Sequence, residues 1–250
     1  MNSLEWLKYY RNNSRDRIEP EWHLPCPLEP ATQRALARSL SHFQLGETGH
    51  GTFLLKRAAT QAPDDAAYHE ALRLFIAEER EHARLLECLV RRFAGETIRR
   101  HWTHTLFRLV GRTLGLNFEL QVLVIAELVG TAYYRLLHAR SRDPVLEQVC
   151  NRILRDETCH VDFHADWLGE SHLWFLLLEH ALWHAQFQIL FGLAAHVAWF
   201  DHRHRLEIIG GSRREFFREA RRECIHFLRR LDSGDASDPL RPSAPVDGLL

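Results

Sequence analysis

Apolar residues repeat with helical spacing along most of this 250-residue chain. From about residue 31 to residue 231 they recur three, four and seven positions apart, and no window alternates strictly between apolar and polar residues. This is the pattern of an α-helix that buries one face. The sequence therefore predicts an all-α fold, with a single helical domain over residues 1–231.

Turn signals divide this region into helices. Pro63-Asp64-Asp65 separates a first helix, which begins near Ala31, from a second, and Ser141-Arg142-Asp143-Pro144 separates a third from a fourth. Each turn supplies an acidic N-cap and a proline that the first helical turn tolerates. Gly95 is expected to end the second helix. A long connector over residues 97–116, broken by glycines, then leads to the third.

The two ends of the chain follow different patterns. Four prolines between residues 20 and 30 predict that the first 30 residues form an irregular segment wrapped around the helices. Ser171 is expected to cap a fifth helix, and Ser212-Arg213-Arg214-Glu215 is a capping box that opens a sixth. The Ser, Asp and Pro content of residues 232–250 predicts a disordered tail.

Ionisable side chains interrupt the apolar stripe of each of the four central helices. The interrupting residues are, in chain order, Glu47, Glu79 with His82, Glu127, and Glu157 with His160. A carboxylate inside a helical bundle is unfavourable unless it is paired or bound to a metal. Four helices therefore each direct a carboxylate toward the core, and two of them add an imidazole three residues later.

The spacing of these residues predicts that they meet. Glu47 and Glu79 are 32 residues apart with Asp64 near the middle, and Glu127 and Glu157 are 30 apart with the second turn at their midpoint. At about 1.5 Å per residue, each carboxylate lies roughly 22 Å from its turn. All six side chains are thus expected in one layer of the bundle.

The E-x-x-H pattern by itself is weak, because it occurs four times in this sequence. Its other occurrences are Glu47–His50 and Glu223–His226. We interpret Glu223–His226 as a solvated or core-edge helix face. His50 is adjacent to the predicted site, and two roles stay open for it, a further ligand or a residue that orients one.

The order Glu, E-x-x-H, Glu, E-x-x-H resembles that of the ferritin-like di-iron or di-manganese superfamily. The resemblance implies a ferritin-like four-helix bundle over about residues 31–170, with additional C-terminal helices over about 171–231. It also implies that the six residues bind two metal ions. The run Asp156-Glu157-Thr158-Cys159-His160 is similar to that of acyl-carrier desaturases and related oxygenases, which implies that Asp156 orients a histidine ligand.

The same resemblance implies two iron ions, with manganese or a mixed pair as alternatives, and O2 as co-substrate. We expect an oxygenase or oxidase that hydroxylates, desaturates or N-oxygenates a small, partly apolar organic molecule and takes electrons from a donor protein or reductant. Thr131 follows Glu127 by one turn, as the active-site threonine does in bacterial hydrocarbon monooxygenases; the alternative is a hydroxyl bonded to its own helix backbone. Tyr134 is either a hydrogen-bond donor or radical site, or an ordinary core tyrosine.

Two other functions stay open at this stage. The first is a ferroxidase or peroxide-detoxifying protein like ferritins and rubrerythrins, although the chain is longer than a minimal bundle and has no C-x-x-C pair. The second is a non-catalytic helical adaptor, in which arginines would neutralise the inward acids and the protein would fold without metal.

Composition bears on the partners and the cellular compartment of the protein. The net charge of -1 gives no general attraction to nucleic acid. Five scattered cysteines and the absence of a signal-peptide pattern indicate a reducing cytoplasm. The apolar stretch Leu173–Phe200 is interrupted by Glu179 and several histidines, which favours a buried bundle helix over a membrane span. A homodimer is left open.

Overall fold

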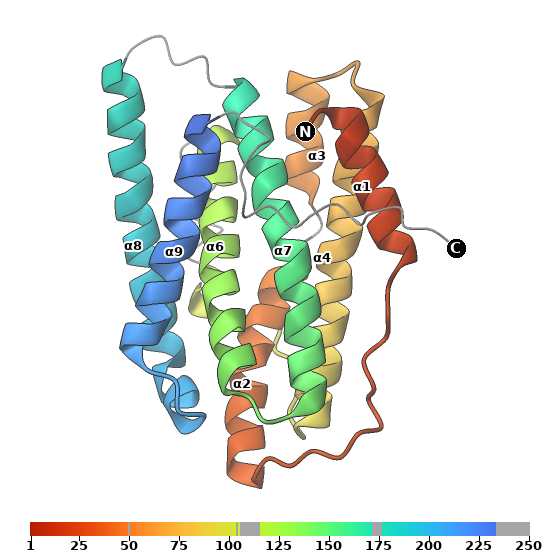
Figure 1. The fold of residues 1–250 in the computed structure, drawn as a ribbon, viewed down its shortest axis with the longest axis vertical. Coiled ribbons are helices and arrows are strands. Elements are labelled where there is room, and N and C mark those ends of the chain that lie inside the picture. Colours follow the sequence, from red (N-terminus) through yellow and green to blue (C-terminus); the bar gives the residue numbers. More distant parts are fainter. Residues whose placement is uncertain (50, 104, 106–115, 172–176, 234–250) are drawn as a thin grey trace.

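The computed structural model describes residues 1–49, 51–103, 105, 116–171 and 177–233 (Figure 1). These residues form eight helices and no strand, so the predicted all-α class is confirmed for this part of the chain. In chain order the helices are α1 (Ser3–Arg15), α2 (Pro30–Glu47), α3 (Thr52–Gln61), α4 (Ala66–Arg92), α6 (Leu116–Arg140), α7 (Pro144–Ser171), α8 (Leu177–Ile208) and α9 (Arg213–Ser233).

The helices form a bundle whose long members run along its long axis (Figure 1). Helix α4 packs against α2 and α1, and α6 packs against α7. Helices α4 and α7 meet in the middle, which brings the two helical pairs together. Helix α9 covers α6 and α7, and α8 packs against α6, α2 and α9.

The turn signals act as expected. Asp65 and Asp143 each accept a hydrogen bond from the backbone N–H three residues further on, and so cap α4 and α7. Ser212 and Glu215 form the predicted capping box in front of α9. These caps satisfy backbone donors that have no partner inside the first turn of a helix.

The N-terminal segment differs from the prediction. Residues Ser3–Arg15 form α1 rather than an irregular wrap, with a capping box between Asn2 and Glu5. Trp6 and Tyr10 are buried on the face that packs against α4. The prolines begin only at Pro20, so the local signal against a helix does not reach the first 15 residues.

The first predicted core helix is also not continuous. It ends at Glu47 and restarts as α3 at Thr52. Gly51 between them has a φ of +60°, and a Cβ at this position would lie 2.3 Å from Ile76 Cδ1. The break therefore needs both the left-handed conformation and the close approach to α4 that only glycine permits.

We expect Gly51→Ala to lower the free energy of unfolding by about 1–3 kcal/mol, because it combines an unfavourable φ with overpacking against Ile76. Urea unfolding followed by circular dichroism measures this loss. Gly49→Ala is the matched control, because a Cβ added at Gly49 would meet no atom within 4 Å and the φ of Gly49 is not positive. Equal stability of the two variants would contradict a special role for Gly51.

Several helix ends differ from the positions that the sequence predicts. Ser171 is the last residue of α7 rather than the cap of the next helix, and α8 begins at Leu177. Helix α4 ends at Arg92, before Gly95, with Ala94 in the left-handed region at φ 53°. Most of the predicted connector over 97–116, and the predicted tail beyond residue 233, lie outside the described residues.

The long apolar helix α8 is buried on one face only. Trp183, Phe187 and Trp199 are buried, whereas Leu182 and Phe200 are exposed on the opposite side. Within the described residues, the one segment long and apolar enough to span a membrane is Leu120–Arg140, and 83% of its window is buried inside the bundle. That segment is the central helix of the core.

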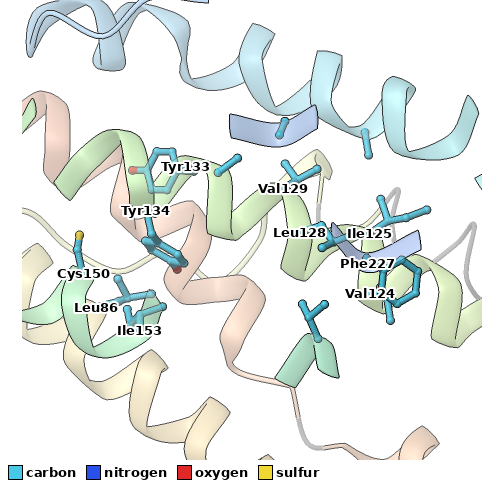
Figure 2. Packing of buried hydrophobic residues seen from close by; sticks show 14 of the residues in the cluster. Leu86, Val124, Ile125, Leu128, Val129, Tyr133, Tyr134, Cys150, Ile153 and Phe227 are labelled. Carbon is cyan, nitrogen blue, oxygen red and sulfur yellow. The ribbon is translucent and has the colours of Figure 1, made fainter. Parts of the chain in front are cut away.

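Figure 2 shows the packing around this central helix. Tyr133 and Tyr134 leave α6 in different directions, and Tyr134 lies on the side of Leu86 and Ile153. These two aliphatic residues come from α4 and α7 and are fully buried. Apolar side chains of α4, α6 and α7 therefore come together near Tyr134.

Candidate metal centre

Helices α4 and α7 bring four ionisable side chains together in the core. Glu79 and His82 come from α4, and Glu157 and His160 come from α7. Each offers one potential ligand atom, and these four atoms all lie within 4.8 Å of one another. The group could hold a metal ion, and it contains four of the six residues that the sequence predicts as ligands.

Two carboxylates on the far sides of the imidazoles orient them. His82 on α4 donates from Nε2 to Asp156 Oδ2 on α7 at 3.2 Å, and His160 on α7 donates from Nε2 to Glu78 Oε2 on α4 at 3.1 Å. The two hydrogen bonds cross between the helices. Asp156 is the residue for which the sequence predicts this role, whereas Glu78 is not singled out, although it also directly precedes a predicted ligand glutamate.

Because Nε2 of each histidine faces outward, Nδ1 faces the centre of the cluster. His160 Nδ1 lies 2.9 Å from Glu79 Oε1 and 3.7 Å from Glu157 Oε2. His82 Nδ1 lies 3.5 Å from Glu157 Oε1 and 3.7 Å from Glu79 Oε1. Both imidazoles and both carboxylates thus converge on one small volume.

Several of these converging atoms are buried without a hydrogen-bond partner among the described residues. They include His82 Nδ1 and Glu157 Oε2. A buried polar atom without a hydrogen bond is normally unfavourable. Two imidazole nitrogens and carboxylate oxygens in this arrangement match the ligands that iron and manganese accept. The residues present therefore fit a metal centre.

Glu47, at the end of α2, adjoins the cluster. Tyr134 donates a hydrogen bond from its hydroxyl to Glu47 Oε1 at 3.1 Å. Burial, together with the nearby negative charges of Glu79 and Glu157, raises the pKa of Glu47 well above its usual range.

Glu127 on α6 also lies near the cluster, and it is paired with His164, a residue that the sequence does not single out. Its Oε1 lies 3.2 Å from His164 Nε2 on α7. Burial raises the pKa of Glu127, and His164 opposes that rise. His164 lies one helical turn after His160, and this i+4 spacing is the signal that places both imidazoles on the same face of α7.

The pKa values of the cluster favour protonated imidazoles beside an ionised Glu79. Burial lowers the pKa of both His82 and His160, but the surrounding carboxylates outweigh it and raise both values well above the usual range. Burial raises the pKa of Glu79, yet its contacts with the two imidazoles lower that pKa to about 2. A metal ion binding here must displace these protons.

Helix α1 completes the outer side of the site. Asn13 donates to Glu78 Oε1 at 2.8 Å and to Asp156 Oδ1 at 3.0 Å. Arg17 lies 3.6 Å from Glu78, and Arg152 lies 3.6 Å from Asp156. The cations thus neutralise the outward acids.

By contrast, no arginine or lysine of the described segments forms an ion pair with Glu79 or Glu157. The adaptor hypothesis needs such arginines at the inward acids. In the described segments the inward acids contact His82 and His160 instead. Elsewhere, Glu223 pairs with Arg135 at 2.7 Å between α9 and α6, away from the cluster.

The remaining predicted site residues are placed as follows. The buried Thr131 donates from its hydroxyl to the backbone carbonyl oxygen of Glu127 at 2.9 Å. This is the bond to its own helix backbone that the sequence leaves as an alternative. Tyr134 is buried and reaches the site through Glu47. His50 lies outside the described residues. A catalytic role for Thr131 or Tyr134 stays a prediction.

Comparisons with protein-family models, with curated proteins and with solved structures returned no match.

Proposed function

We propose that this protein is a ferritin-like di-metal oxidoreductase that uses O2 to oxidise a small organic substrate. The observation that carries the proposal is the crossed pair of hydrogen bonds from His82 to Asp156 and from His160 to Glu78. Because these bonds fix both Nε2 atoms outward, both Nδ1 atoms face the inner carboxylates. Each could then donate its lone pair to a metal ion bound between them.

In this proposal Glu79, Glu157, His82 and His160 would hold the two metal ions, and Glu47 and Glu127 would complete the ligand set. Asp156 and Glu78 hold the imidazole tautomers, and Tyr134 holds Glu47 through its hydroxyl. The aliphatic residues of α4, α6 and α7 exclude bulk water from this layer.

Ferrous ions in such a site supply the one-electron chemistry that O2 reduction requires. The overall reaction proposed inserts one oxygen atom into a C–H or N–H bond of the substrate and reduces the other to water, with two electrons from an external reductant and two protons. Desaturation by the same protein would take two hydrogens from the substrate and, with two electrons from the same reductant and two protons, reduce O2 to two waters.

The direct test is anaerobic loading with ferrous iron, followed by metal analysis, the optical spectrum after O2 exposure, and O2 consumption with a panel of apolar acids, amines and aromatic compounds. We expect about two ions per chain and O2 consumption that rises with a productive compound. No metal uptake would overturn the proposal.

The alternative is a ferroxidase, which the same ligands favour equally well. That function predicts oxidation of many ferrous ions per chain and mineral deposition by a cage-like oligomer. Size-exclusion chromatography with iron analysis separates the two, because the oxygenase retains its two ions and the iron store accumulates far more.

Thr131→Val is expected to leave both metal ions bound and to lower the yield of oxidised product per O2 consumed several-fold. The reason is that the Thr131 hydroxyl would leave the Glu127 carbonyl during turnover and transfer protons near the site. Thr158→Val is the matched control. Its hydroxyl makes the same kind of bond, to the Leu154 carbonyl oxygen at 2.9 Å, but on α7 and half-buried. Equal yields in the two variants would reduce Thr131 to a helix-packing residue.

A further inference from the structure

A second group of metal-binding side chains lies away from the carboxylate centre, where α2, α8 and the segment after α4 meet. His42 Nδ1 on α2 lies 2.8 Å from Asp201 Oδ2 on α8. His101 Nε2 lies 3.8 Å from the same oxygen. One potential ligand atom from each of the three residues lies within 4.8 Å of the other two.

These separations suit a single transition-metal ion. Zinc binds imidazole nitrogen and carboxylate oxygen at about 2.0–2.2 Å with tetrahedral geometry, which places neighbouring ligand atoms roughly 3.3–3.6 Å apart. The two measured distances to Asp201 Oδ2 lie on either side of this range. To accept an ion, the His42 contact with Asp201 must lengthen and the His101 contact must shorten, each by less than about 1 Å.

The imidazole rings of His42 and His101 are stacked beside Asp201. The ring centroids of His42 and His101 are 3.8 Å apart, with an interplanar angle of 28°. Two protonated rings at this distance would repel each other strongly. At most one of the two rings can therefore pair with Asp201 as an imidazolium. Because each nitrogen lone pair lies in the plane of its ring, the two rings must turn out of this stack to share one ion.

The surroundings hold these groups in place. His101 Nδ1 is bonded to Thr103 Oγ1 at 2.6 Å, which turns Nε2 toward Asp201. The buried His202 lies beside the group, with Nε2 3.4 Å from Asp201 Oδ2 and Nδ1 bonded to Ser39 Oγ at 2.7 Å.

The group is separate from the carboxylate centre. Phe43 stacks on Tyr133 at 3.9 Å and contacts the rings of both His202 and Tyr134. Aromatic rings therefore lie between this group and Glu47, which Tyr134 contacts. The side chains of His42, His101 and Asp201 are 12–15% exposed, so an ion can enter from solvent.

We propose that His42, His101 and Asp201 bind one divalent transition-metal ion, with zinc favoured, and that water completes its coordination. Two imidazoles and one carboxylate leave at least one position open to solvent. The ion would join α8 to α2 and to the segment after α4, which are distant in sequence. The proposal does not depend on the function of the carboxylate centre.

The test is zinc titration of the whole chain, with bound zinc counted after removal of loosely held metal. His42→Ala is expected to bind one zinc ion fewer per chain than wild type, and His204→Ala is the matched control because His204 is an exposed histidine on α8. The iron content of the carboxylate centre, measured on the same variants, is expected to be unchanged. Any zinc bound at the carboxylate centre is present in every variant, so it cancels when the zinc count of a variant is subtracted from that of wild type.

Cobalt supplies a second measurement. Wild type is expected to show the intense visible bands of four-coordinate cobalt, and His101→Gln to lose them; this variant alters a residue outside the helices and therefore tests the site if His42→Ala does not fold. Equal zinc counts in wild type, His42→Ala and His101→Gln would overturn the proposal. Loss of the bands only on changing Glu79 would do the same.

Discussion

Alanine at Glu79 or at Glu157 is expected to remove most of the iron, and alanine at both positions to reduce it from about two ions per chain to nearly none. Each carboxylate faces the inward nitrogens of both histidines, at 2.9 and 3.7 Å for Glu79 and at 3.5 and 3.7 Å for Glu157. Each substitution therefore removes a group that touches the whole cluster. Metal analysis after anaerobic loading measures the loss.

Helix content is expected to stay unchanged in these variants, because the apolar stripes and caps hold the bundle independently of the metal. Far-UV circular dichroism checks this. Glu87→Ala is the control on the same helix, since Glu87 pairs with the exposed Arg91 at the surface. Two ions per chain in the double variant would refute the metal assignment.

The second large effect concerns the carboxylates that orient the histidines. Asp156→Asn and Glu78→Gln are each expected to weaken metal binding about 10- to 100-fold. Each change keeps the size of the side chain but removes the negative charge that accepts the Nε2 hydrogen of His82 or His160. The imidazole then becomes a weaker and less well oriented ligand.

Competition with a coloured chelator measures these affinities. Glu81→Gln makes the same chemical change on α4, at a glutamate that pairs with Arg84 on the surface at 2.7 Å. This control is expected to bind metal like wild type. An unchanged affinity in the Glu78 and Asp156 double variant would show that the crossed hydrogen bonds serve packing rather than the metal.

The sequence predicts the site best where the position of a turn also determines which residues of neighbouring helices lie at the same height. Asp65 and Asp143 fix where α4 and α7 begin, and the spacing from each turn then fixes which residues lie at the same height. Glu79 and Glu157 are consequently expected, from the sequence alone, to face each other. The structure brings them together with their histidines.

The features that escaped prediction depend on contacts between elements. Glu78 lies in the run Glu78-Glu79-Arg80-Glu81, and which of its acids reaches across to α7 depends on the rotation of α4 about its axis. His164 gains its significance only from Glu127 on another helix. The break at Gly51 likewise depends on Ile76, a residue of the opposing helix.

The division of the centre between two helical pairs has a consequence for how the chain folds. Helices α2 and α4 carry one half of the acidic cluster, and α6 and α7 carry the other; the contacts that join them link residues 74 and 82 positions apart. Each hairpin can form early from local contacts, while docking must close a long loop and bury like charges together. We therefore expect docking to be the late, slow step, and a cation present at that moment to speed it by drawing the acidic side chains together.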